Sequence, residues 1–138
     1  KSDHLFKNFS TQITRKKPVL KIYGNNYNTK DGSCIRDFIH VSDIAEIHEK
    51  VLNKIGNSNK SVVLNCGYNQ GISVKQVANE FKKQSNKNVK IVEVKKRPGD
   101  LGKIIASNNR LNKFINWKPK YKKLSFMVKS SIIWEKKI

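Results

Sequence analysis

Apolar and polar residues alternate in blocks along the chain, and the blocks follow two different periods. Val19–Tyr23 and Ser61–Cys66 are short apolar runs, and the second has the continuous apolar character of a buried parallel strand. Val89–Val94 alternates like a half-exposed strand. Ile35–Val41, which follows a loop dense in Gly, Asn and Asp, is also strand-like. These runs are the predicted strands.

Between the strands, apolar residues recur at the three- and four-residue spacing of amphipathic helices. The predicted helices cover residues 42–55, a segment that begins at Ser73, residues 108–114 and residues 124–136. Ser42 or Asp43 can cap the first helix, and Gly56 can end it. Gln76 stands at the capping-box offset from Ser73. Strands that alternate with helices in this way predict an α/β protein.

The chain has 138 residues, which suggests one domain, and its charge is strongly positive. The net charge of +19 arises from 29 Lys and Arg against 10 Asp and Glu, but only four of the basic residues are Arg and the lysines are scattered. Because base-specific readout depends heavily on Arg, this charge favours salt-sensitive attraction to polyanions and no specific nucleic-acid partner. A basic nucleic-acid-binding module remains the alternative from another functional class.

Several motifs are absent from the sequence. It has no zinc-type cysteine spacing, no Gly-rich dinucleotide fingerprint, no P-loop and no nucleophile elbow, so we predict no metal site, cofactor site or catalytic residue within it. No run approaches the roughly 20 apolar residues of a membrane-spanning helix, and no signal peptide is visible. Cys34 and Cys66 are therefore expected to be reduced thiols in a cytoplasmic protein that does not contact a membrane.

The stretch Gly32–Val41, GSCIRDFIHV, concentrates residue types that do chemistry. Strand alternation places Arg36 and Phe38 on one face and Asp37 on the other, apolar face. A guanidinium beside an aromatic ring suits an anionic ligand with a flat group, and a surface Arg that pairs locally is the alternative. Asp37 and His40 are interpreted as structural, hydrogen-bonded groups.

A second polar cluster, KKRPGD at residues 95–100, forms a loop directly after the strand predicted at 89–94. Loops at strand ends are where α/β proteins hold ligands. Arg97 could pair with a phosphate group, and Asp100 could accept from a sugar hydroxyl. A solvated, charged turn is the equally weighted alternative.

Five segments carry a resemblance that covers nearly the whole chain: HLF at 4–6, LKIYGNNYNTKDGSCIRDFIHVSDIAEIH at 20–48, LNCGYNQGISVKQV at 64–77, KRPGD at 96–100 and INWKPKY at 115–121. In order and spacing they resemble the C-terminal part of the UDP-glucose 4-epimerase family, in the extended branch of the short-chain dehydrogenase/reductase superfamily. The resemblance implies an α/β fold that is the substrate-binding C-terminal portion of a Rossmann-type enzyme, with the N-terminal Rossmann core mostly absent.

The resemblance implies a substrate-binding role, and no catalytic role, for these residues of the chain: His4, Leu5, Lys21, Ile22, Tyr23, Arg36, Arg97, Asp100 and Ile104. His4 and Leu5 match a pair near the uracil end of the substrate. Residues 21–23 match a strand that hydrogen-bonds the uracil edge through its backbone. The two arginines match residues that bind the diphosphate, and Asp100 matches an acid that bonds ribose hydroxyls. Ile104 matches a position that limits sugar size.

The resemblance also implies the reaction of the full-length protein. Enzymes of this family bind NAD with an N-terminal Rossmann domain and interconvert UDP-glucose and UDP-galactose through a 4-keto intermediate, with a catalytic Tyr and Lys. The NAD site and this pair would lie upstream of Lys1, so the isolated chain is expected to be inactive. Residues 38–68 are expected to pack on the missing Rossmann sheet, and the full-length enzyme could form a homodimer. Another extended-branch nucleotide-sugar epimerase or dehydratase is the alternative.

Overall fold

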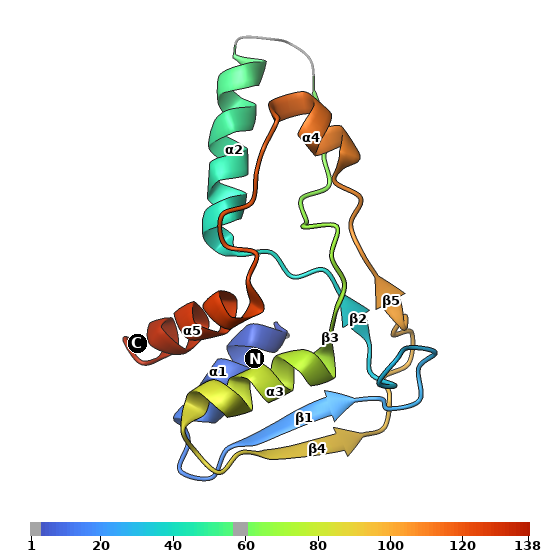
Figure 1. Cartoon of the computed structure of the whole chain (residues 1–138), viewed down its shortest axis with the longest axis vertical. Helices are drawn as coiled ribbons and strands as arrows, with labels where there is room; N and C mark the ends of the chain where they lie inside the picture. Colours follow the sequence, from blue (N-terminus) through green and yellow to red (C-terminus); the bar gives the residue numbers. More distant parts are fainter. Residues whose placement is uncertain (1–3, 57–60) are drawn as a thin grey trace.

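Helices and strands are interspersed along the chain, as the pattern predicts. The structure, a computed structural model, describes residues 4–56 and 61–138. Within them the elements follow in this order: α1 (Leu5–Thr14), β1 (Val19–Tyr23), β2 (Ile35–Arg36), α2 (Val41–Ile55), β3 (Ile72–Ser73), α3 (Val74–Ser85), β4 (Lys90–Val94), β5 (Lys103–Ile104), α4 (Asn109–Ile115) and α5 (Leu124–Glu135). The α/β class is confirmed (Figure 1).

The longest strand pairing joins β1 and β4 in parallel, with Val19 opposite Lys90 and Tyr23 opposite Val94. Leu20 and Ile22 of β1 are fully buried, whereas the odd-numbered residues of this strand are partly or largely exposed. Because side chains alternate along a strand, one face of the pair packs against α1 and α3 and the other face is open (Figure 1).

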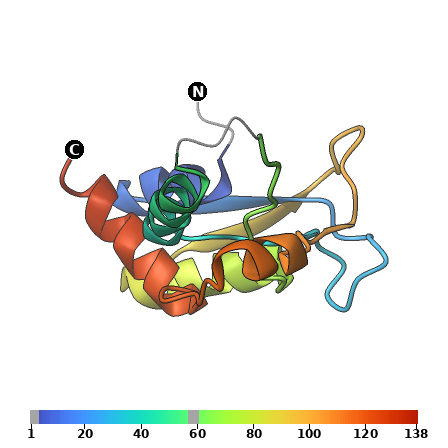
Figure 2. The same ribbon diagram turned by 90° about the horizontal axis from the view of Figure 1, so that it is seen from above.

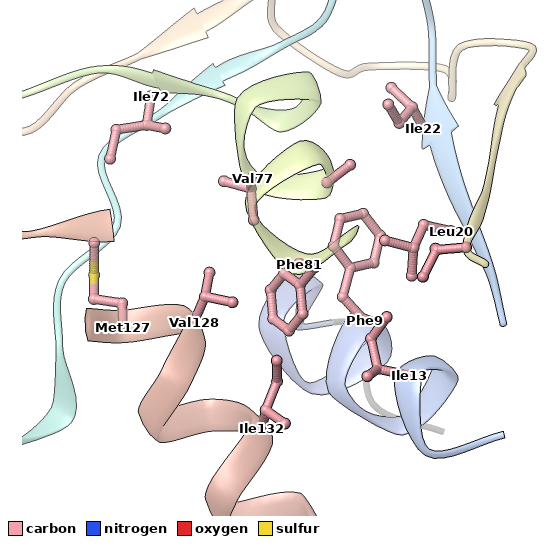
Figure 3. Packing of buried hydrophobic residues seen from close by; sticks show 12 residues of the cluster. Phe9, Ile13, Leu20, Ile22, Ile72, Val77, Phe81, Met127, Val128 and Ile132 are labelled. Atoms are coloured by element: carbon pink, nitrogen blue, oxygen red, sulfur yellow. The ribbon is translucent and has the colours of Figure 1, made fainter. Parts of the chain in front are cut away.

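The main core fills the space between this sheet and the three helices α1, α3 and α5 (Figure 3). Phe9 of α1 meets Phe81 of α3 edge to face, with ring centroids 5.5 Å apart, and Val128 of α5 is fully buried beside them. Helix α1 was not among the predicted helices. The signal was present, since Leu5, Phe9 and Ile13 recur at four-residue spacing.

Two of the predictions about helix ends are confirmed and one is wrong. The capping box of α3 is confirmed: Ser73 Oγ accepts from the Gln76 amide at 3.1 Å, and Gln76 Oε1 accepts from the Ser73 amide at 2.9 Å. Gly56 ends α2 with φ +51°, as predicted. The predicted cap at the start of α2 is wrong, because the ring of His40, and not Ser42 or Asp43, accepts the first amide.

Two predicted strands are corrected. The strand predicted at Ile35–Val41 covers only β2, because Val41 already begins α2. Residues 61–66 form no strand, and no described segment pairs with them; Val63 is 77% exposed there. A continuous apolar run becomes a buried strand only where a sheet receives it. Strand β5, which extends the small sheet in the order β3-β2-β5, was not predicted either.

A second, smaller core surrounds the base of α2. Ile47, Leu111 and Trp117 are buried together there. Beside them Asp43 is fully buried: its carboxylate accepts from the backbone amides of residues 120 and 121, at 3.1 and 3.0 Å, and from the hydroxyl of Tyr68. One carboxylate thus joins α2 to the extended segment before α5 and to the segment before β3.

Replacing Asp43 with Asn is expected to destabilise the chain by about 2–4 kcal/mol, because the amide would turn N–H donors toward donors already present. Urea unfolding followed by circular dichroism measures the change. Glu46→Gln, one turn later on α2, removes exposed ion pairs to Lys50 and Lys120 and should cost less than about 1 kcal/mol. Equal losses in the two variants would contradict the role given to Asp43.

Candidate functional site

A groove of about 910 Å³ lies beside β1, between α1, β2 and the loop that follows β4. Several of the residues predicted to bind substrate line it: Leu5, Lys21, Tyr23, Arg36, Arg97 and Asp100. They come from four segments that are distant in sequence. The groove is therefore a product of the tertiary fold, although each segment was recognisable in the sequence.

The edge of β1 that faces away from β4 carries free backbone groups. Gly24 donates its amide to the carbonyl of Val94 at 2.8 Å, across from β4. In a parallel ladder alternate residues bond to the same neighbour, so Ile22 also directs its backbone toward β4. Lys21 and Tyr23 then direct their N–H and C=O groups to the opposite edge, where no strand of the described residues pairs. This edge offers a donor and acceptor pattern to a planar ligand.

Arg36 is held in place by the loop across the groove. Its Nη1 donates to the carbonyl of Leu101 at 2.8 Å and to the carbonyl of Ile35 at 2.9 Å. Its Nη2 lies 3.7 Å from Oδ1 of Asp100, and the Arg36 side chain remains 24% exposed. The guanidinium is thus oriented by backbone contacts and keeps an exposed edge for an anion.

Arg97 reaches the groove from the loop after β4. Its guanidinium lies 4.0 Å from the centroid of the Tyr23 ring, a cation–π contact. Within residues 4–56 and 61–138 it has no carboxylate partner. Arg15, at the end of α1, also lines the groove, so three arginines from separate segments border it. Among the described residues, only the Arg36 guanidinium has a carboxylate within ion-pair distance.

The other residues of GSCIRDFIHV divide between the groove and the structure. Cys34 is buried at its wall, and Phe38 lines it while packing edge to face on Phe6, with centroids 5.3 Å apart. Asp37 faces elsewhere and accepts from the amides of Tyr68 and residue 69, at 3.1 and 3.0 Å. The structural interpretation of Asp37 is confirmed.

Three of the predicted residues do not line the groove. His4 is exposed just before α1. The side chain of Ile22 is fully buried in the core, on the opposite face of β1 from Lys21, and its backbone faces β4. Ile104 is 47% exposed on β5. Conversely, α1 contributes Asn8 and Gln12 to the wall, and neither was predicted because α1 itself was not.

His40 lies away from the groove, as a structural group. Its Nδ1 accepts from the Ser42 amide at 3.1 Å, so the neutral ring carries its proton on Nε2, which lies 3.0 Å from Ser130 Oγ. Burial lowers the pKa of His40 below its ordinary value of 6.5, and the nearby Asp43 carboxylate opposes that shift. The unfolded chain therefore binds this proton more readily than the folded chain.

Acidification should weaken the fold through His40. The stabilisation is complete above about pH 6.5 and is lost as the pH falls through the lowered pKa of the folded state. Urea unfolding is measured at pH 7.5 and at pH 5.5. The free energy of unfolding should fall less between these pH values in His40→Asn than in the original chain, because Asn retains a capping acceptor but does not titrate. An identical loss in the variant and the original chain would contradict this role.

The described residues hold no cluster of three or more His, Cys, Asp or Glu side chains that could bind a metal ion. None of the helices in the described part of the chain has the length and apolar character needed to cross a membrane.

Comparison with known proteins identifies the class. The chain is 38% identical to a UDP-Glc/GlcNAc 4-epimerase from Campylobacter jejuni, whose structure matches all of this chain and 42% of that one with a TM-score of 0.87. The Bifidobacterium longum UDP-glucose 4-epimerase in complex with NAD+ and UDP is 28% identical, and the match covers 97% of this chain and 39% of that one with a TM-score of 0.87. The fold is thus the C-terminal portion of an extended short-chain dehydrogenase/reductase.

The family follows from the sequence match. The profile of the family described as GDP-mannose 4,6 dehydratase matches residues 3–129, and the chain belongs to that family. A UDP-glucose 4-epimerase from Azospirillum brasilense is 36% identical over 135 residues, which cover 98% of this chain and 39% of that protein. The chain therefore spans about 40% of the length of the relatives it matches.

Proposed function

We propose that this chain is the UDP-sugar-binding portion of an NAD-dependent UDP-sugar 4-epimerase, with UDP-glucose and UDP-galactose as its substrates. The observation that carries the proposal is the groove in which Arg36, Arg97 and Asp100 meet the free edge of β1. Two guanidinium groups match the charge of a diphosphate, and one carboxylate beside them can accept from ribose hydroxyls.

In this proposal each part of the groove holds one part of the ligand. The free N–H and C=O groups of Lys21 and Tyr23 pair with the edge of the uracil ring, and Leu5 packs on the base. Arg36 and Arg97 hold the diphosphate from two sides. His4 and Ile104, which lie outside the groove in this structure, would contribute at the uracil and sugar ends only after a change of position. Ile22 supports the strand from within the core.

The remaining parts of the reaction are assigned to segments outside these 138 residues. NAD, bound there, would accept and return a hydride at C4 of the sugar, while this chain holds the UDP group so that the sugar is presented to it. The chain alone is therefore proposed to be inactive.

A different nucleotide-sugar epimerase or dehydratase of the same branch is the second candidate, because the same groove would serve it. With both cysteines present as free thiols, we assign the protein to the reducing cytoplasm.

Calorimetry with UDP tests the groove. Arg36→Gln and Arg97→Gln should each weaken binding by about 1.5–3 kcal/mol, because each removes charge-assisted hydrogen bonds to the diphosphate. Arg110→Gln is the matched control, since this Arg is exposed on α4 and lies outside the groove. Uridine, which lacks the diphosphate, should bind more weakly than UDP. Its affinity should be the same for the two groove variants and for the original chain.

Binding of single-stranded DNA tests the alternative that the chain is a basic nucleic-acid-binding module. A UDP site should survive an increase in salt that abolishes DNA binding, because attraction to DNA is dominated by counterion release. No UDP binding by the original chain, or equal losses in the Arg110 control and the groove variants, would overturn the proposal.

We further propose that residues 38–68, of which 57–60 lie outside the described residues, dock on a sheet supplied by another part of the full-length protein. Val41 on α2 is 73% exposed, Leu52 is 70% exposed and Val63 is 77% exposed. Residues 61–66 run without a strand partner among the described residues, so their backbone groups could extend a parallel sheet. Both observations fit a chain that covers about 40% of its relatives.

The isolated chain should therefore self-associate. Sedimentation velocity over a hundredfold concentration range is expected to show dimers or larger species, because exposed apolar patches associate in water. A Leu52→Lys/Val63→Lys double variant should shift the chain toward monomer. Ile133→Lys on α5, where the side chain is 47% exposed, is the control and should leave the association unchanged. A monomer at all concentrations would contradict the docking proposal.

A further inference from the structure

The ring of Tyr27 occupies the space between two glycines that begin and end the loops beside the groove. A Cβ atom at Gly24 would collide with Cε2 of this ring, and a Cβ atom at Gly102 would lie 3.4 Å from its Cδ1. Gly24 also has φ +85°, a conformation that favours glycine. The ring therefore packs directly against the backbone at Gly24, and it lies beside Gly102 with room for one methyl group between them.

These two glycines mark the ends of the segments that carry the proposed ligand-binding groups. Gly24 directly follows Tyr23 at the end of β1. Gly102 follows the loop that holds Asp100, and its carbonyl accepts from the Ile35 amide at 2.8 Å. Figure 2 shows the loops after β1 and β4 projecting from the same end of the molecule. Tyr27 thus lies where the two loops meet.

A second contact sets the direction of the loop after β4. The ammonium of Lys96 lies 6.0 Å from the centroid of the Tyr27 ring, and the guanidinium of Arg97 lies 4.0 Å from that of Tyr23. Consecutive side chains of an extended segment point to opposite sides. With Lys96 directed to Tyr27, the next residue is directed to Tyr23 and into the groove.

We propose that Tyr27 is a positioning residue of the groove: its ring separates and supports the two loops so that Arg97 and the Arg36–Asp100 pair face one ligand. The ring does not itself line the groove. The inference deepens the proposed function, on which its ligand-binding consequence rests, while its structural consequence is independent of any ligand.

The aromatic ring, and not the hydroxyl, performs this role. Tyr27 Oη is buried and has no hydrogen-bond partner that satisfies normal geometry among the described residues. The neighbouring Cys34 thiol, together with burial, raises the pKa of Tyr27 to about 12, so the hydroxyl is neutral at physiological pH. Phenylalanine would fill the same space and retain a face for Lys96.

The test compares Tyr27→Phe, Tyr27→Leu and Tyr27→Ala in this chain. Tyr27→Phe should bind UDP within about twofold of the original chain, Tyr27→Leu should be intermediate, and Tyr27→Ala should bind about tenfold more weakly or worse, because misplacing a charged group is costly. Hydrogen exchange read by NMR supplies a readout without ligand. The amides of Gly24 and Ile35 should lose protection in the Ala variant, while those of α3 should not.

Each outcome decides the inference. Equal UDP affinity and equal protection in Tyr27→Ala would overturn it, and a Phe variant as weak as the Ala variant would assign the role to the hydroxyl instead. If the original chain binds no UDP, the proposed function fails, and the exchange of Gly24 and Ile35 alone decides the positioning role. If the Ala variant does not fold, Tyr27→Leu replaces it in both measurements.

Discussion

The parallel pairing of β1 with β4 is the constraint on which the rest of the structure depends. It places Leu20 and Ile22 against the helices, so that one face of a short sheet closes the main core. It also leaves the backbone groups of Lys21 and Tyr23 on an edge that no described strand occupies. Because the strands are parallel, the loops that follow them leave from the same end, and Arg97 arrives beside Tyr23. Core and groove are consequences of one register.

The molecule has two apolar clusters that share one aromatic residue. The larger cluster joins α1, α3 and α5 to the sheet, and the smaller one lies between α2, α4 and the segment before β3. The ring of Tyr68 packs against both, while its hydroxyl donates to the buried carboxylate of Asp43. A buried charge needs several donors to be tolerated, and these donors come from segments that are brought together only by the tertiary fold. The smaller cluster therefore depends on polar contacts as much as on apolar area.

The charge of +19 has less bearing on function than its size suggests. Most of the basic residues in the described part of the chain are exposed lysines, whereas three of the four arginines, Arg15, Arg36 and Arg97, line the groove. Arg36 is oriented by backbone carbonyls and Arg97 by an aromatic ring. Orientation of this kind distinguishes a site that can recognise a particular anion from a surface that attracts any polyanion. The placement of these arginines therefore indicates a binding site, whereas the total charge of the chain does not.

The sequence by itself determined the α/β class, the capping box at Ser73, the end of α2 at Gly56 and two of the arginines that border the groove, because periods, caps and motifs are local properties. Only the tertiary structure decided the rest. Residues 61–66 read as a buried strand, yet a strand requires a sheet, and no described segment supplies one. His4, Ile22 and Ile104 matched a motif but lie outside the groove, because a side chain's direction depends on which face of its strand or helix the core covers. The ring of Tyr27 is local to Gly24, but its approach to Gly102 joins segments about seventy-five residues apart, a distance at which no local pattern carries information.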